Sequence, residues 1–281
     1  MMFHADSQKA AALIQHRAGT APIDFAIVLA RSMGGFADHL TDAVDVKFSD
    51  LPGLSASAGA DDARIVIGQA GSARVAIICG ALRFHECGDA NVMRPLFEIM
   101  KLLGAASVVL TGAAGSARHE IKPGAIVTIR DHINFTGINP LLNQSDPDRY
   151  VDLSRGYDAE LRERFHVAAN EIGRKVPEAV YFLMSGPSFE TPAEVNAART
   201  FGADIIGMSV VPEMLIARHL GLRVLAIAIV TNFAAGLSEE PISRDHIARV
   251  IVATMGSFSR VLMRFCEIWR LNAQMGSQKG R

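Results

Sequence analysis

The stretch GMSVVPEMLIARHLGLRVLAIAIVTN, residues 207–232, decides the fold class. Its first part predicts a helix over residues 212–220, because proline is favoured in the first helical turn and Gly221 can end a helix in the left-handed conformation. Its second part predicts a strand over residues 222–231. This strand is apolar on consecutive residues, which is typical of a sheet covered on both faces. A helix followed directly by such a strand indicates an α/β protein.

The same alternation of short apolar runs and helical patterns continues along the rest of the chain. Further strands are predicted over residues 25–30, 64–68, 73–80, 106–111, 125–129 and 180–184. The strands 64–68 and 73–80 are joined by Ala70, Gly71 and Ser72, which predicts an antiparallel hairpin. We therefore expect one α/β domain with a mixed sheet over residues 1–281.

Helix starts and ends are marked by specific residues. Thr191 as N-cap, Pro192 at the first position and Glu194 at the third predict a helix that ends at Gly202. Ser243 caps the last predicted helix, whose apolar residues recur at helical spacing. Other helices are predicted over residues 1–20 and 91–103, a polar tail without fixed structure over 272–281, and a long loop over 132–156.

Composition excludes several classes of protein. The chain has 28 basic and 29 acidic residues and a formal charge of −1, so it has no general electrostatic attraction to nucleic acid or to an anionic membrane. Its three cysteines are widely spaced, which is typical of a cytoplasmic protein with neither a disulfide framework nor a zinc site. The first residues lack the pattern of a secretory signal, and no apolar run is long enough to span a bilayer.

Small and polar residues collect where the predicted strands end. In open α/β sheets ligands bind beyond the carboxyl ends of the strands. The junctions concerned are residues 31–35, 83–85, 111–115, 185–191 and 231–232. Glycine and alanine let backbone N–H groups approach an anion, and Arg83 and His85 supply donors beside them. The sequence therefore predicts a phosphate site next to a pocket lined by Phe189, Glu190 and Asn232.

Each of these residues also has a purely structural interpretation. Phe189 and Met208 would serve equally as core residues. Glu190 would stabilise the start of the following helix, since negative charge is favourable there. Asn232 would cap a turn at the end of its strand.

The motifs together resemble those of the trimeric class of purine nucleoside phosphorylases. They are RFH at 83–85, TGAAG at 111–115, RDHINFTGINPL at 130–141, GPSFETPAE at 186–194 and the stretch 207–232. The resemblance implies a mixed sheet curled toward a barrel, a homotrimer, and phosphorolysis of purine nucleosides to the free base and a pentose 1-phosphate. It implies no metal and no organic cofactor, with inorganic phosphate as co-substrate.

The resemblance also implies roles for individual residues. It places Arg31, Ser32, Arg83, His85, Ala113 and Ser209 at phosphate. It places Ala114, Gly115, Phe189, Glu190 and Asn232 at the base, and Cys87, Tyr150, Met208, Arg244 and His246 at the sugar, with Tyr150 near the neighbouring subunit's site. His85, Glu190 and Asn232 are the catalytic candidates. Because a carboxylate at position 190 accepts the N1–H of a 6-oxopurine and adenine offers no such hydrogen, we expect a preference for inosine and guanosine, ribo or deoxy.

Four features depart from the family pattern. Arg31 replaces a phosphate-binding serine and would either bind phosphate or fill the pocket. Cys87 replaces a tyrosine, and the glutamate expected nearby is lost or displaced to Glu86. Gly112 replaces an asparagine, and Arg244 a histidine. Two alternatives therefore stay open: a purine-binding protein that has lost turnover, and a phosphorylase with a shifted preference for the sugar or its 5′-substituent.

Overall fold

A nine-stranded mixed sheet forms the centre of the computed structural model, which describes residues 3–59, 62–142, 144, 147–239 and 241–270. The strands are β1 (Phe25–Val28), β2 (Thr41–Lys47), β3 (Arg64–Ala70), β4 (Ala73–Cys79), β5 (Ser107–Ser116), β6 (Ile126–Asn134), β7 (Glu178–Leu183), β8 (Ile205–Gly207) and β9 (Arg223–Phe233). Their order is β2-β3-β4-β1-β5-β8-β7-β6-β9, and β9 pairs again with β5. The last five strands thus close into a barrel, which confirms the predicted single α/β domain with a partly barrel-like sheet.

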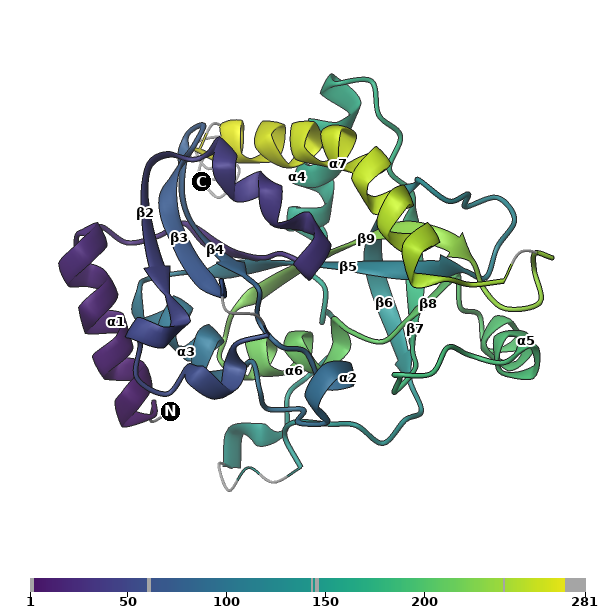
Figure 1. Cartoon of the computed structure of the whole chain (residues 1–281), viewed down its shortest axis with the longest axis horizontal. Coiled ribbons are helices and arrows are strands. Elements are labelled where there is room, and N and C mark those ends of the chain that lie inside the picture. The colour runs from purple at the N-terminus through teal and green to yellow at the C-terminus, as the bar shows by residue number, and fades with distance from the viewer. Residues whose placement is uncertain (1–2, 60–61, 143, 145–146, 240, 271–281) are drawn as a thin grey trace, which may run out of the picture.

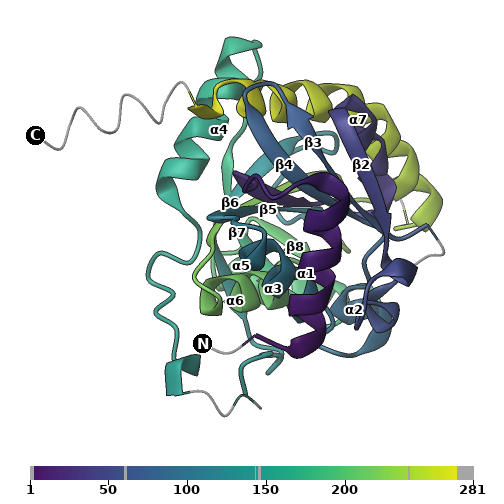
Figure 2. The same cartoon turned by 90° about the vertical axis from the view of Figure 1, so that its left-hand side faces the viewer.

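Helices cover both faces of this sheet (Figure 1). They are α1 (Ala5–Ala18), α2 (Phe84–Cys87), α3 (Arg94–Leu102), α4 (Ala159–Glu171), α5 (Pro192–Thr200), α6 (Val211–His219) and α7 (Arg244–Glu267). On one side α4 packs against α7, and on the other side α3 packs against both α1 and α6. Figure 2 shows α1 standing at the outer edge of this second layer.

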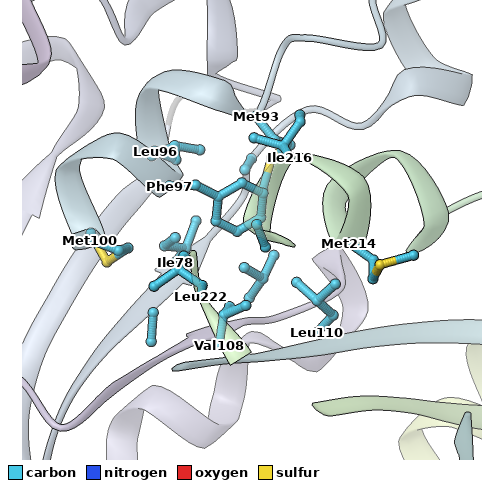
Figure 3. Packing of buried hydrophobic residues seen from close by; sticks show 14 of the residues in the cluster. Ile78, Met93, Leu96, Phe97, Met100, Val108, Leu110, Met214, Ile216 and Leu222 are labelled. Carbon is cyan, nitrogen blue, oxygen red and sulfur yellow. The ribbon is translucent and has the colours of Figure 1, made fainter. Parts of the chain in front are cut away.

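Alternate residues of each central strand enter two different cores. In β1, Phe25 and Ile27 pack with the α4 and α7 side, whereas Ala26 and Val28 pack with the α1, α3 and α6 side. Figure 3 shows the second core, in which the Phe97 ring of α3 lies among aliphatic side chains from the sheet and α6. Burying one such side chain stabilises the fold by about 1.5–3 kcal/mol. Because both faces are covered, the strands are apolar on consecutive residues.

The predicted boundaries are confirmed where capping residues mark them. The Thr191 side chain accepts a hydrogen bond from the backbone N–H of Glu194, and the Glu194 carboxylate accepts one from the N–H of Thr191. Ser243 caps α7 through the N–H of His246. The hairpin of β3 and β4 is antiparallel as predicted, and Gly71 in its turn has a φ of 58°.

Four predicted boundaries are wrong. The stretches 111–115 and 231–232 do not follow strands but lie inside β5 and β9, because these strands pair from Ser107 and Arg223 as far as Ser116 and Phe233. The predicted loop 132–156 begins later, because β6 continues beside β7 to Asn134. The predicted helix 91–103 begins only at Arg94.

Four of these helices and strands are missing from the prediction, namely β2, β8, α2 and α4. The predicted tail 272–281 lies outside the described residues. Within the described residues, none of the helices combines the length and the apolar character needed to cross a bilayer.

We expect His132 to make the stability of the fold depend on pH. Burial lowers the pKa of this histidine, whose Nδ1 lies 3.2 Å from the Tyr157 hydroxyl. The unfolded chain, with a histidine pKa of about 6.5, then binds a proton more readily than the folded chain, so stability falls as the pH drops below that value. The contribution of one such group has a limiting slope of about 1.4 kcal/mol per pH unit.

The check is urea unfolding of the wild type and of His132→Asn at pH 7.5 and pH 5.5. The wild type should lose more stability between the two pH values than the variant, whatever the stability of the variant at pH 7.5. An equal loss in both proteins would contradict the assignment.

Candidate active site

One cavity of about 210 Å³ brings most of the predicted site residues together. It lies beyond the ends of β1, β4 and β8 and beside the segment that follows β7. The second halves of β5 and β9 also border it. Its lining consists of Ala30, Arg31, Ala81, Arg83, His85, Glu86, Gly112, Ala113, Ala114, Gly115, Phe189, Glu190, Ile206, Gly207, Met208, Ser209, Thr231, Asn232 and Ile247. The candidate phosphate residues and the candidate base residues therefore share one space.

Arg83 is held rigidly at this cavity. It is 5 % exposed, its Nη2 donates to the backbone oxygen of Thr111 at 2.9 Å, and its Nη1 donates to Glu213 Oε1 at 3.3 Å. Glu213 is 1 % exposed, lies in the first turn of α6 and was not predicted as a site residue. A buried guanidinium needs such a counter-charge, because an unpaired buried charge is strongly unfavourable. The guanidinium is thus fixed before any ligand arrives.

His85 faces the same cavity as a neutral ring. Burial lowers its pKa from the usual value, so the imidazole is uncharged at neutral pH. Its buried Nδ1 has no hydrogen-bond partner among the described residues. A neutral imidazole offers one N–H donor and one acceptor, which suits a ligand with oxygen atoms.

A strained turn presents Ser209 to the cavity. The next residue, Val210, has a φ of 75° and a ψ of −47°. The N–H of Val211 donates to the backbone oxygen of Ser209 at 2.9 Å. This is a γ-turn of the rare strained kind, and a β-branched residue adopts it only where its surroundings impose it. The hydroxyl oxygen of the fully buried Tyr181 accepts the Ser209 N–H at 3.1 Å and supports the turn. Strain of this kind gathers at functional sites.

Glu190 and Asn232 form the other part of the cavity. Glu190 is 9 % exposed, and its Oε1 accepts the N–H of Ala235 at 3.4 Å. Asn232 Oδ1 accepts from the Thr231 hydroxyl at 2.8 Å, while Nδ2 donates to the Phe233 oxygen at 2.8 Å. The amide is thus oriented, and the second hydrogen of Nδ2 is left for a ligand. Both side chains line the cavity, which neither a helix start nor a turn cap requires.

Phe189 and Gly115 shape the space around that amide. Phe189 lines the cavity but remains 42 % exposed, so it lies at the opening and is not a core residue. A Cβ at Gly115 would lie 3.2 Å from Asn232 Nδ2. Glycine at this position therefore makes room for the amide.

Arg31 and Glu86, two positions at which the sequence departs from the family pattern, pair with each other. Arg31 Nη2 lies 2.7 Å from Glu86 Oε1, and the Arg31 side chain is 51 % exposed. Glu86 Oε2 also accepts the backbone N–H of Arg83 at 3.0 Å. Arg31 therefore lies at the rim of the cavity, half exposed, and does not fill it.

Four of the five residues predicted to contact the sugar do not line the cavity. Cys87 Sγ lies 3.4 Å from the Arg83 backbone oxygen, at the end of α2, because the short helix turns it back on its own first turn. Tyr150 is 82 % exposed, and the Arg149 guanidinium lies 5.1 Å from the centre of its ring. Arg244 and His246 lie in the first turn of α7, from which Ile247 alone reaches the cavity. Met208 does line it. The side chain of Ser32, predicted at phosphate, lies outside the described part of the structure.

We expect a side chain at Gly112 to disturb the part of the cavity that Ser209 lines. A Cβ there would lie 3.1 Å from Val210 Cγ2 and 3.2 Å from Ser209 Oγ. Gly112→Ala should therefore lower the free energy of unfolding by about 1–3 kcal/mol and raise the dissociation constant of inorganic phosphate about 2- to 10-fold.

Gly256→Ala is the matched control, because Gly256 lies in α7, does not line the cavity, and a Cβ there meets no atom within 4 Å. Chemical denaturation and calorimetric titration with phosphate measure the two effects. Stability and phosphate binding equal to those of the control would show that the contact with Ser209 has no consequence.

Comparison with known proteins gives a consistent relationship. The family model of the phosphorylase superfamily matches residues 25–267. The chain is 34 % identical over 257 residues to purine nucleoside phosphorylase 1 of Geobacillus stearothermophilus, covering 90 % of this chain and 93 % of that protein. It is 35 % identical over 270 residues to the purine nucleoside phosphorylase of a Cellulomonas species, covering 93 % and 92 %.

Solved structures agree with this relationship. The crystal structure of a Schistosoma purine nucleoside phosphorylase with hypoxanthine superimposes with a TM-score of 0.88 at 26 % identity, over 94 % of this chain and 97 % of that one. A second structure, of the Schistosoma mansoni enzyme with adenosine, has a TM-score of 0.87 at 26 % identity over 94 % and 97 %.

Proposed function

This chain belongs to the phosphorylase superfamily, as an enzyme of the purine nucleoside phosphorylase type, and on that basis we propose that it acts on 6-oxopurine nucleosides. Its substrates would be inosine, guanosine and their 2′-deoxy forms. Its products would be the free base and ribose or deoxyribose 1-phosphate. The proposed cellular role is purine salvage.

The arrangement of one carboxylate and one amide in the base part of the cavity carries this proposal. An ionised Glu190 can only accept hydrogen bonds, so it suits the N1–H of hypoxanthine or guanine. Adenine presents a lone pair at N1 and would leave two acceptors facing each other. The free hydrogen of Asn232 Nδ2 suits an acceptor on the same base. Because a buried group left unpaired is costly, such a site rejects the mismatched base strongly.

The same cavity supports a mechanism for breaking the glycosidic bond. A phosphate held by Arg83, His85 and Ser209 places an oxygen near the anomeric carbon and attracts the positive charge that develops on the sugar. The oxygen forms a bond to C1′ while the bond from C1′ to N9 breaks, and the electron pair moves onto the purine. The departing base becomes negative and binds a proton. The Asn232 amide stabilises that charge by a hydrogen bond that strengthens as the charge grows.

The assembly and the reaction conditions belong to the same proposal. We propose a homotrimer, with Tyr150 near the sugar site of the neighbouring subunit. The exposed rings of Phe135 and Phe201, which contact each other at 5.0 Å, support an interface at that place, because contiguous exposed apolar surface marks contact sites. Phosphate is a co-substrate, and the proposed reaction uses neither a metal nor an organic cofactor. A cytoplasmic location is proposed from the pattern of free cysteines.

An adenosine-accepting enzyme is the second candidate. A related structure contains adenosine, so membership of the family alone does not fix the base. The separation between the candidates lies in Glu190, which offers an acceptor where adenine also offers one. A purine-binding protein without turnover is a third candidate, since Cys87, Tyr150, Arg244 and His246 do not line the cavity of one chain.

The test is product analysis with purified protein. We expect inosine and phosphate together to give hypoxanthine and ribose 1-phosphate, no hypoxanthine when phosphate is omitted, and far slower release of adenine from adenosine. Equal rates on inosine and adenosine would contradict the 6-oxopurine preference. Binding of hypoxanthine without any release from inosine would favour the purine-binding alternative.

A further inference from the structure

The ion pair of Arg31 with Glu86 lies across the rim of the phosphate part of the cavity. Both side chains line that cavity, and their closest atoms are 2.7 Å apart. Glu86 is bound at both carboxylate oxygens, since the other oxygen accepts the Arg83 N–H at 3.0 Å. One short segment thus carries Arg83 and His85, which are both predicted to bind phosphate. The same segment carries Glu86, the ion-pair partner of the third predicted phosphate-binding residue, Arg31.

The two cations at this part of the cavity are neutralised in different ways. Arg83 is buried with Glu213, and a buried pair is broken only at a cost of several kcal/mol. The Arg31 and Glu86 side chains are 51 % and 25 % exposed, and a pair of this kind contributes only about 0–1 kcal/mol. The Arg83 pair is therefore fixed, whereas the Arg31 pair exchanges partners at low cost.

We propose that the Glu86 carboxylate competes with phosphate for Arg31 and thereby sets the affinity of the cavity for phosphate. Without an anion, Arg31 pairs with Glu86. When phosphate binds, Arg31 turns to it and Glu86 loses its partner, so Glu86 weakens phosphate binding. This inference rests on the proposed function, because it assumes that the anion at Arg83 is phosphate.

The charges favour competition over support. A dianion that enters beside Arg31 meets the negative charge of Glu86 within a few ångströms, and at this partly exposed rim the repulsion is only partly screened. Glu86 also neutralises the positive charge of Arg31 at the cavity. Both effects oppose phosphate, and both disappear when Glu86 loses its charge.

Glu86→Gln separates the two contacts of this side chain. The glutamine oxygen keeps an acceptor for the Arg83 N–H, while the amide nitrogen faces Arg31 with hydrogens and cannot pair with it. The local turn should therefore persist while Arg31 is released. Asp89→Asn is the matched control, because Asp89 loses the same charge nearby, contacts the Asn91 N–H instead of Arg31, and does not line the cavity.

The experiment titrates inorganic phosphate into the full chain by calorimetry, at low and at high salt. At low salt Glu86→Gln should lower the dissociation constant of phosphate about 3- to 10-fold relative to Asp89→Asn, and high salt should reduce the difference. Arg31→Ala should weaken binding, and Glu86→Gln should tighten binding less in the Arg31→Ala background than in the wild type, because only the direct repulsion between Glu86 and phosphate is then removed. Unchanged or weaker binding in Glu86→Gln, or an equal gain in the Arg31→Ala background, would overturn the proposal.

Turnover of inosine separates this inference from the proposed function. We expect Glu86→Gln to lower the KM for phosphate without lowering kcat, whereas a merely structural role would lower kcat and thermal stability together. Tighter phosphate binding in a protein that releases no hypoxanthine would overturn the proposed function and leave the competition intact. Normal turnover of inosine by Glu86→Gln with an unchanged KM for phosphate would overturn the competition and leave the proposed function intact.

Discussion

Asn232→Ala should lower the kcat of phosphorolysis about 10²- to 10³-fold while changing the KM for inosine little. The reason is that the amide acts mainly on the charge that appears on the departing purine, and loss of one such donor costs roughly 2.7–4 kcal/mol of transition-state stabilisation. The amide is already oriented by Thr231 and by the Phe233 oxygen. It therefore needs no rearrangement when the bond breaks.

Steady-state kinetics on inosine at saturating phosphate measure this effect. Asn196→Ala is the control, because Asn196 lies exposed on α5 and away from the cavity. A variant of Asn232 that keeps kcat within twofold of the control, or that raises only KM, would show that the amide binds substrate without stabilising the leaving group.

Glu190→Gln should reduce the ratio of kcat/KM for inosine over adenosine at least about 100-fold. Discrimination by a site that hydrogen-bonds a specific group reaches about 10⁴–10⁵, and it depends on the carboxylate being unable to donate. A glutamine can turn its amide to donate to N1 of adenine. Its oxygen can still accept the Ala235 N–H, so the fold around residue 190 should persist.

Glu194→Gln provides the matched control for this variant. It removes the same charge four residues away, and glutamine still serves in the capping box with Thr191. The two kcat/KM values are measured for each protein on both nucleosides. An inosine preference that survives in Glu190→Gln, or that falls equally in Glu194→Gln, would remove Glu190 as the determinant of base preference.

The sequence predicted those parts of the fold that depend on local signals. The capping residues Thr191 and Ser243 define where α5 and α7 begin, because a side-chain oxygen at that position binds a free N–H of the first turn. β8 was missed because three residues, Ile205–Gly207, are too few to show a pattern. The lengths of β5 and β9 were underestimated because their polar ends are paired with each other, which only the closed barrel reveals.

The candidate site was predictable where residues follow strands or carry the family motifs. Arg83, Ser209, Glu190 and Asn232 come from distant parts of the chain and share one cavity. The supporting residues were not predictable, since Glu213 lies 130 positions from its partner Arg83 and has no periodic signal. The ion pair of Arg31 with Glu86 was not predictable either. Each residue departs from the family pattern separately, and only the structure shows that the two side chains contact each other.

The most direct measurement is a crystal structure of the protein with hypoxanthine and phosphate bound together. We expect the base to lie flat in the cavity with its N1–H at the Glu190 carboxylate and its N7 edge at the Asn232 amide, and the anion to contact the Arg83 guanidinium and the Ser209 hydroxyl. A base bound away from Glu190, or Glu190 and Asn232 contacting different ligands, would contradict the account.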